Sequence, residues 1–286
     1  MENTLNDLIS GCVILYNPNA IVIDNIITYI DKLHILYVVD NSDKHNEGVI
    51  KQLLALSNKV IYVDNGGNIG IATALNKACN LACNAGYKWM LTMDQDSFFS
   101  DTSFFELIGN KNNPKVAIYA ASYTNEYDRW VKEFDLNFDE VHYLITSANV
   151  LSLNAWKHVN GFEDKLFIDE VDHDFCLKLR KLNYVLLSSK QLFLQHAVGE
   201  ISETSVKIKP KLNLHQPIRY YYIARNGLYI CKKYFFSDIN FALKRLFYLL
   251  KAFVKIILLY PDKLRYLKFY FTGVKDFFLS RYGKLR

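Results

Sequence analysis

The stretch KWMLTMDQDSFFS, residues 88–100, joins an apolar run to an unusual polar end. Its first half has the length and composition of a strand covered on both faces, as in a parallel sheet. The run then ends in Asp94, Gln95 and Asp96. Carboxylates with i, i+2 spacing point the same way and repel each other, and a divalent cation relieves that repulsion best. The stretch therefore predicts a metal-binding strand end or, taken alone, a solvated loop with two unrelated acids.

Three further apolar runs precede this one, and helix-like stretches separate them. The runs read CVILYN, HILYVVDNS and KVIYVDN, and the helical patterns cover residues 21–32, 48–56 and 71–85. This alternation predicts an α/β fold with a doubly wound, mostly parallel sheet flanked by helices. Ligands of such sheets bind beyond the carboxyl ends of the strands. The runs here end in polar residues, namely Asn17, Asp40, Asn41, Asp64, Asn65, Asp94 and Asp96.

The sequence GGNIG, residues 66–70, opens a predicted helix directly after a strand. Backbone N–H groups and the helix dipole at such a turn can face an anion. The glycine spacing is not the GxGxxG of a dinucleotide site, and the chain contains no GxxxxGK[ST] phosphate loop. The turn therefore indicates an anionic ligand without identifying it.

The length of the chain suits one large domain, or one domain with a helical appendage. Strand-like runs at residues 116–124, 141–152, 184–189 and 192–198 alternate with helical patterns. From Pro217 the pattern is helical to the end, with a break at Pro261. We therefore expect an α/β domain over residues 1–216 and a helical region over residues 217–286.

Charge is distributed unevenly along the chain. Residues 241–286 carry 11 Lys and Arg against 2 Asp, a net charge of +9, whereas the first 240 residues carry 23 basic against 27 acidic residues. Amphipathic helices with a cationic side lie in anionic membrane interfaces, so we expect peripheral membrane contact through the C-terminal helices. A packed helical subdomain is the alternative. No recognised DNA- or RNA-binding module accompanies the charge, so we expect no nucleic-acid partner.

Compartment signals in the sequence favour the cytoplasm. The opening MENTLNDLIS lacks a basic patch followed by an apolar stretch, and no uncharged apolar run approaches the length of about 20 residues that a spanning helix needs. The five cysteines form no CxxC pair. We therefore expect a cytoplasmic protein whose cysteines are small core residues.

Seven short motifs occur in one order between residues 11 and 226. They read LYNP, VVDNSD, GGNIGIATALN, TMDQDS, LFIDEVDHDFCLKLR, QHAVGE and RYYYIARN. In this order they resemble the motifs of glycosyltransferase family 2, and most closely its rhamnosyltransferase-like branch, in which DQDS and FID-x-VD-x-[DE]-[FW]-C recur. The resemblance implies a GT-A fold, a nucleotide-sugar site that uses Mg²⁺ or Mn²⁺, and transfer with inversion.

By matching position, the resemblance implies a nucleotide site at the ends of the first strands. Tyr16 and Asp40 would contact a pyrimidine base, and Asn41 would lie beside it. Asn68 and Gly70 would line the nucleoside pocket. The donor would then be a dTDP- or UDP-sugar, and the residues do not distinguish the two bases.

The resemblance also implies how the diphosphate and its metal ion would be held. Asp94 would face the ribose, Asp96 would bind the metal, and His196 would contact the metal or the diphosphate. Arg225 and Asn226 would hold the diphosphate, because an arginine fork matches phosphate oxygens. The alternative for that helix is packing through its tyrosines, and both can hold together.

An inverting displacement needs a base for the acceptor hydroxyl, and the acid-rich FIDEVDHDF segment offers candidates. Alignment on the family motif implies that Asp172 is the general base. Asp169 is the second candidate, because residues three apart share a helix face, and its alternative role is to orient Asp172. We expect Asp174 to form a cap or to bind a neighbouring basic residue. The alternative is a helix N-terminus that is acidic for dipole reasons alone.

The resemblance thus implies an inverting glycosyltransferase that moves a sugar, expected to be L-rhamnose from dTDP-rhamnose, onto a saccharide or lipid-linked saccharide. The reaction would serve synthesis of a cell-surface polysaccharide such as an O-antigen at the inner face of the membrane. One alternative is a non-catalytic nucleotide-sugar-binding scaffold subunit. The other is a sugar nucleotidyltransferase, which would carry a Gly-rich, basic signature where this chain has CVILYNPNA.

Overall fold

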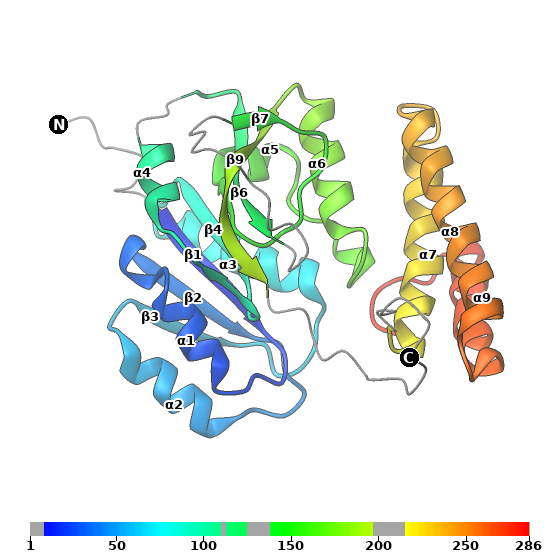
Figure 1. Ribbon diagram of the computed structural model, residues 1–286, viewed down its shortest axis with the longest axis horizontal. Helices are drawn as coiled ribbons and strands as arrows, with labels where there is room; N and C mark the ends of the chain where they lie inside the picture. Colours follow the sequence, from blue (N-terminus) through cyan, green and yellow to red (C-terminus); the bar gives the residue numbers. More distant parts are fainter. Residues whose placement is uncertain (1–8, 110–112, 125–137, 197–214, 286) are drawn as a thin grey trace. The chain divides into compact units, whose positions relative to one another are not determined.

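The structure is a computed structural model that describes residues 9–109, 113–124, 138–196 and 215–285. The chain divides into two compact units. One comprises Met1–Glu163 with Asp172–Ala197, and the other comprises Asp164–Val171 with Val198–Arg286. The α/β elements and the three C-terminal helices are labelled in Figure 1.

Four parallel strands form the first half of the sheet in the α/β unit. They are β1 (Ile9–Leu15), β2 (Ile35–Asp40), β3 (Val60–Asp64) and β4 (Trp89–Asp94), in the order β3-β2-β1-β4. Asp40 lies in register with both Leu15 and Asp64, and Asp94 lies in register with Ile14. The predicted rim of polar strand ends is therefore present.

The second half of the sheet is mixed. β8 (Asn149–Ser152) pairs antiparallel with β4 and is followed by β6 (Val116–Thr124), β9 (Val185–His196) and β5 (Ser97–Phe99). β7 (Phe138–Glu140) pairs with β9. Two strands were predicted at residues 184–189 and 192–198, but the backbone continues as one. The Ser189 hydroxyl, bonded to Ser122 N and Gln191 O, supports the irregular pairing at the polar interruption.

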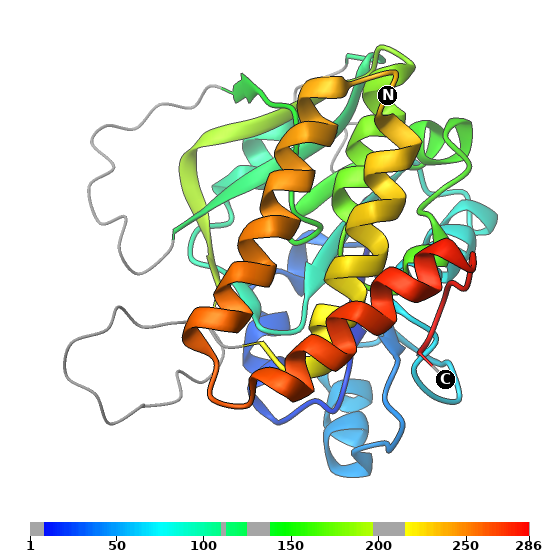
Figure 2. The same ribbon diagram turned by 90° about the vertical axis from the view of Figure 1, so that its right-hand side faces the viewer.

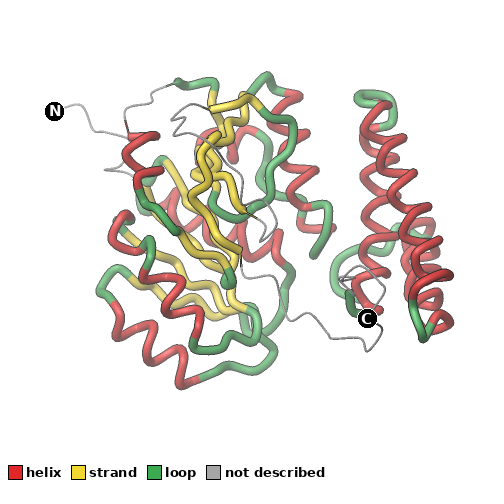
Figure 3. The backbone as a smooth tube through the Cα atoms, viewed as in Figure 1, coloured by secondary structure: helices red, strands yellow, loops and turns green. Residues whose placement is uncertain are grey.

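Helices cover both faces of this sheet, as the tube in Figure 3 shows. α1 (Ile21–Ile27) and α2 (Glu47–Leu56) lie on one face and α3 (Ile71–Asn84) lies on the other (Figure 1). The remaining helices of the unit are α4 (Ser103–Gly109), α5 (Leu153–His158) and α6 (Val171–Lys181), with 3-10 turns η2 (Ile30–Lys32) and, in the other unit, η3 (Asp164–Leu166). Four of the five free cysteines are buried as predicted, and Cys83 is half-buried.

The other unit contains α7 (Pro217–Tyr234), α8 (Ile239–Leu259) and α9 (Lys263–Phe278), which Figure 2 shows in yellow, orange and red. Proline at the start of α7 and the Asp238 side chain, which accepts from Phe241 N, define two helix N-termini. Their core includes Tyr220, Leu249, Ile256, Tyr260 and Tyr270. The predicted helices are present, and the predicted domain boundary at residues 216 and 217 stays a prediction.

Within the described part of the chain, no helix combines the length and the apolar character needed to cross a bilayer.

Candidate active site

Three carboxylates meet at the rim beyond β4. Asp94 ends β4, Asp96 lies in the following turn, and Asp172 lies in the first turn of α6. Burial, followed by the charges of Asp172 and Asp96, raises the pKa of Asp94 to about 7. A buried carboxyl whose pKa is raised by burial and by neighbouring carboxylates is a mark of functional sites. The sequence-predicted acids at positions 94, 96 and 172 are therefore brought together.

Neighbouring side chains hold this arrangement in place. Asp94 N–H donates to the Ser147 hydroxyl at 3.1 Å, and the Thr146 hydroxyl donates to Asp172 Oδ1. Thr146 and Ser147 precede β8, the antiparallel neighbour of β4. Neither was singled out in the sequence, because nothing local marks a Thr-Ser pair as a partner of residues 26 and 53 positions away.

This donor set fits a hard divalent cation shared with a ligand. Among the described residues no group of three His, Cys, Asp or Glu side chains encloses a metal site. Mg²⁺ is commonly bound by one or two carboxylates together with phosphate oxygens and water, so a complete protein cage is not required. A cation at this rim would offset both the burial of the Asp94 carboxylate and its repulsion by Asp172 and Asp96, which together raise the pKa of Asp94.

The metal role of His196 stays a prediction. His196 is the last residue of β9, and its backbone pairs with Ser97. Its side chain lies outside the part of the chain that the structure describes.

Gln95, between the two acids, is a structural residue. Its side-chain amide accepts from Tyr16 N at 2.9 Å and donates to Tyr16 O at 3.2 Å. Its backbone carbonyl accepts from the side-chain amide of Asn25. The Tyr16 residue is 46% exposed, so its ring is accessible to a ligand while its backbone is fixed. The sequence feature that indicates this role is the glutamine at the centre of the DQD motif, because its amide can both donate to and accept from a neighbouring backbone.

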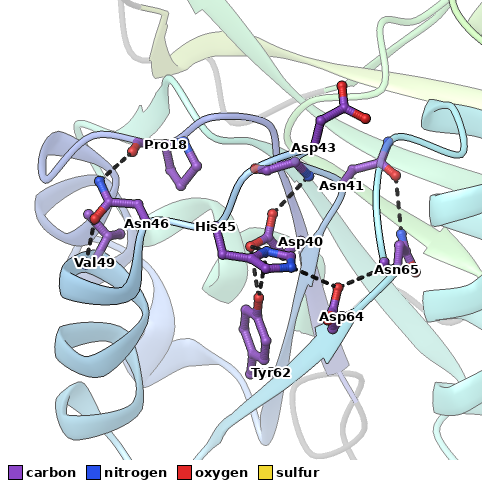
Figure 4. Close-up of polar contacts among 12 residues, drawn as sticks. Pro18, Asp40, Asn41, Asp43, His45, Asn46, Val49, Tyr62, Asp64 and Asn65 are labelled. Atoms are coloured by element: carbon purple, nitrogen blue, oxygen red, sulfur yellow. Dashed lines mark hydrogen bonds and ion pairs between the residues drawn. The ribbon is translucent and has the colours of Figure 1, made fainter.

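Asp40 is engaged inside the protein. It is completely buried, and its carboxylate accepts from Ser42 N, Tyr62 Oη and His45 Nδ1 at 2.8 to 2.9 Å (Figure 4). Burial opposes its ionisation, but hydrogen bonds from Ser42, Tyr62 and His45 outweigh burial and lower its pKa. The hydrogen bond to Asp40 raises the pKa of His45. Asp40 therefore organises the segment after β2, and its predicted base contact stays a prediction that these bonds do not favour.

Asn41 points away from Asp40 and toward Asn65 (Figure 4). Its Oδ1 accepts from Asn65 and from Ile69 N, and its Nδ2 donates to Asn68 Oδ1 at 3.1 Å. Gly70 N donates to the same Asn68 oxygen. The structure thus brings the predicted nucleoside residues at positions 41, 68 and 70 together.

The N–H groups of this glycine turn do not all face outward. Asn68 N donates to Asp43, Ile69 N to Asn41, and Gly70 N to Asn68. The expectation that they present an anion site is wrong for residues 68–70, because side chains of the turn and of the β2 loop take those donors. Gly66, Gly67 and Gly70 have φ of 66°, 132° and 91°. Glycine adopts such positive φ angles without steric cost, so the backbone conformation of the turn accounts for these three glycines.

Arg225 and Asn226 are fully buried in the helical unit. Arg225 donates to Asn226 Oδ1, to the Tyr221 hydroxyl and to the carbonyls of Gly283 and Leu166. Asn226 Nδ2 donates to the carbonyls of Leu166 and Ile168 at 2.6 Å. These contacts match the packing alternative, and the diphosphate contact stays a prediction without support from them.

Asp169 and Glu170 precede α6 and belong to the same unit as the C-terminal helices. Both have left-handed backbones, with φ of 61° and 66°. Asp169 pairs with Arg219 at 3.0 Å, and Glu170 pairs with Arg245. The expectation that Asp169 and Asp172 share a helix face is wrong, because α6 begins at Val171 and the residues before it are not helical.

Asp172 is therefore the better placed of the two base candidates, since Asp169 is engaged by Arg219. Asp174 is completely buried and lies 3.6 Å from Lys178 Nζ, which confirms its predicted pairing with a basic residue. In this segment Asp169, Glu170 and Asp174 pair with basic side chains, whereas Asp172 accepts from the Thr146 hydroxyl.

The dTDP-rhamnosyl transferase RfbF of Shigella flexneri is 26% identical to this chain over 249 residues, which cover 80% of this chain and 81% of that one. The mannosyltransferase PcManGT from Pyrobaculum calidifontis, solved with GDP-Man and Mn²⁺, superposes with a TM-score of 0.58 at 13% identity, covering 96% of this chain and 87% of PcManGT. For residues 1–349 of S. aureus TarS with UDP-GlcNAc, the TM-score is 0.59 at 14% identity, covering 94% and 80%.

The structural likenesses confirm the predicted fold class, a GT-A type α/β sheet flanked by helices with a C-terminal helical appendage. The sequence model described as "Glycosyl transferase family 2" matches residues 15–178. This range is more than half of the chain and includes Tyr16, Asp94, Asp96 and Asp172. The rhamnosyl transferase relative agrees with the branch that the motifs resemble. We conclude that the chain belongs to glycosyl transferase family 2.

Proposed function

We propose that this transferase is a metal-dependent, inverting enzyme that moves a sugar from a dTDP- or UDP-sugar to a saccharide acceptor, with dTDP-L-rhamnose as the expected donor. The observation that carries the proposal is the meeting of Asp94, Asp96 and Asp172, where burial and then the charges of Asp172 and Asp96 raise the pKa of Asp94 to about 7. The rhamnosyl transferase relative supports the choice of donor.

Asp172 acts as the general base in this proposal. The Thr146 hydroxyl orients its carboxylate. As the acceptor oxygen forms its bond to the anomeric carbon of the sugar, its proton passes to Asp172 and the bond from that carbon to the diphosphate oxygen breaks. A single displacement of this kind inverts the anomeric centre.

Asp96, with Asp94 beside it, would hold Mg²⁺ or Mn²⁺, and His196 remains a candidate ligand. The ion, when bound, supplies positive charge to the departing nucleoside diphosphate. Tyr16, with its accessible ring, is the proposed base contact. Asn41, Asn68 and Gly70 form the proposed nucleoside wall.

The direct test is release of dTDP or UDP from a panel of nucleotide sugars, with saccharide acceptors and with Mg²⁺ or Mn²⁺ present. Turnover that stops on chelation and returns with either metal supports the proposal. Nucleotide-sugar binding without turnover across the panel would favour a scaffold subunit instead. Release of pyrophosphate from a nucleoside triphosphate and a sugar phosphate would favour the nucleotidyltransferase.

We also propose peripheral contact with an anionic membrane surface, where a lipid-linked acceptor would lie. One side of α8 exposes apolar side chains at helical spacing, namely Leu243, Phe247, Leu250, Val254 and Leu258. Lys244, Lys251 and Lys255 flank this row. The row can insert between lipids, and each flanking lysine adds about 1 kcal/mol of attraction to an anionic surface.

Sedimentation with vesicles tests this contact. We expect the protein to bind vesicles that contain phosphatidylserine and to bind phosphatidylcholine vesicles more weakly. Leu250→Glu should release it, whereas Leu54→Glu, at an equally exposed leucine of α2, should not. Equal retention of both variants would contradict membrane contact through α8.

A further inference from the structure

A pocket of about 360 Å³ opens beside Asp172 within the α/β unit. Its walls come from β6, from the segment that precedes β8, from the start of α6 and from β9. The volume lies near the lower end of the range of about 300 to 1,000 Å³ that small-molecule sites occupy. The pocket is thus large enough for a sugar residue and is in contact with the proposed base.

The charge of the walls argues against a phosphate ligand. Among the described residues that line the pocket there is no lysine or arginine, and Asp172 is the acid. A diphosphate placed there would meet the Asp172 carboxylate without a lysine or arginine from these described lining residues. The pocket therefore suits an uncharged ligand.

The remaining wall chemistry suits a polyol with an apolar face. The rings of Tyr143 and His173 lie 5.5 Å apart at 53°, and Ile145 adds an aliphatic surface. Ser147 and Asn149 add polar groups. A sugar ring has this dual character, because its C–H faces pack on aromatic rings while its hydroxyls seek hydrogen bonds.

Asn149, one of the lining residues, carries a buried acceptor. The residue is 5% exposed, and its Nδ2 donates to Ile145 O at 2.5 Å. Its buried Oδ1 has no hydrogen-bond partner among the described residues. A buried acceptor without a donor costs about 1 to 3 kcal/mol.

The position of the pocket in the sheet assigns it to the acceptor. The proposed nucleoside residues follow β1, β2 and β3, whereas the pocket lies over β6 and β9, across β4 and β8 in the sheet order. Asp172 lines the pocket and is close enough to Asp94, at the end of β4, for its charge to add to the effect of burial in raising the pKa of Asp94. An in-line displacement requires the acceptor oxygen and the diphosphate on opposite sides of the reacting carbon.

We propose that this pocket binds the terminal sugar of the acceptor, and that this sugar is uncharged. The inference rests on the proposed transfer reaction and deepens it by naming the acceptor class. An acidic sugar would place a second carboxylate beside Asp172 and is therefore disfavoured.

Ligand-observed saturation transfer NMR on the full chain with dTDP and Mg²⁺ tests the pocket. The probes are the methyl glycosides of L-rhamnose, D-glucose and N-acetyl-D-glucosamine, with methyl β-D-glucuronide as the charged comparison. We expect a neutral glycoside to bind and the glucuronide to bind at least about tenfold more weakly. Tyr143→Ala should weaken binding of the neutral glycoside about tenfold, whereas Tyr143→Phe keeps the ring and stays within about twofold.

Tyr184→Ala, at a tyrosine that does not line the pocket, is the matched control and should leave glycoside binding unchanged. The proposal is overturned if no neutral glycoside binds, if Tyr143→Ala has no effect, or if the glucuronide binds equally well. Displacement of the glycoside by dTDP-rhamnose but not by dTDP would assign the pocket to the donor sugar and would also overturn it.

Calorimetry with dTDP on the same samples separates the two levels of inference. Wild type that binds dTDP with metal but shows no Tyr143-dependent glycoside binding contradicts the acceptor pocket alone. Wild type that binds neither dTDP nor UDP contradicts the proposed function itself.

Discussion

The strand-end rim and the helical unit treat buried charge in opposite ways. At the rim, burial and the charges of Asp172 and Asp96 raise the pKa of Asp94 to about 7. In the helical unit, Arg225 is completely buried but donates to carbonyl and hydroxyl oxygens. A buried charge whose partners are neutral hydrogen-bond acceptors, as at Arg225, has a structural role. Buried like charges held close together, as at Asp94, mark a candidate ligand site.

The partners of Arg225 explain why its unit includes a segment far away in sequence. Asp164–Val171 contains three residues with left-handed backbones, Phe167, Asp169 and Glu170. Such conformations cost about 1 to 3 kcal/mol each in non-glycine residues. Hydrogen bonds from Arg225 and Asn226 to the carbonyls of Leu166 and Ile168 offset that cost. Asp172 follows this segment directly in the chain.

The largest expected effect is at the rim. Asp172→Asn removes the proposed base, so kcat should fall by about 10² to 10⁴-fold. Donor affinity by calorimetry should stay within about twofold, because the base does not contact the nucleotide in this proposal. Asp24→Asn, at an exposed acid of α1, is the control and should keep full turnover. Undiminished turnover of Asp172→Asn would remove Asp172 from the mechanism.

Arg225→Ala tests the structural side of the comparison. The change removes the Arg225 donor of the Gly283 carbonyl and leaves the Leu166 carbonyl with Asn226 alone as its side-chain donor, so the free energy of unfolding should fall by roughly 3 kcal/mol. Urea denaturation of the full chain measures it. Arg219→Ala breaks a pair whose arginine is 44% exposed and should cost at most about 1 kcal/mol. A stable Arg225→Ala protein with weakened nucleotide binding would restore the predicted diphosphate contact.

A smaller effect is expected where α9 approaches α7. A Cβ on Gly273 would collide with the Tyr221 carbonyl, so Gly273→Ala should lower the free energy of unfolding by about 1 to 3 kcal/mol. Gly48→Ala in α2 is the matched control, because its Cβ would lie 3.5 Å from Asn46 Oδ1, an ordinary contact. Equal stability of both variants in thermal unfolding would mean that the helices can separate there without cost.

The smallest effect concerns pH. The hydrogen bond to Asp40 raises the pKa of His45, so the stability it contributes is present below the unfolded value of about 6.5 and is lost as pH rises through the folded value. The Tm difference between wild type and His45→Asn should shrink over that window. A Tm difference between wild type and His45→Asn that grows with pH would contradict a raised pKa of His45.

Local patterns were sufficient for the parallel half of the sheet and for the acids at its rim. Continuous apolar runs that end in Asp40, Asp64 and Asp94 predict strands whose carboxyl ends meet. They were insufficient for β9, because the polar residues between its two apolar runs indicate a turn. The Ser189 hydroxyl, which bonds across to β6, keeps that strand continuous.

The fold class, the family and the carboxylates at 94, 96 and 172 were predictable from the amino-acid sequence alone, because they depend on periodicity and on short motifs along the chain. Only the tertiary structure decided which polar residues already have partners. Asp40 accepts from Tyr62, Arg225 donates to carbonyls about 60 residues away, and the buried Asn149 oxygen has no hydrogen-bond partner among the described residues. The reason is physical: whether a polar side chain faces a ligand or the protein depends on groups that folding brings beside it, and no local pattern contains them.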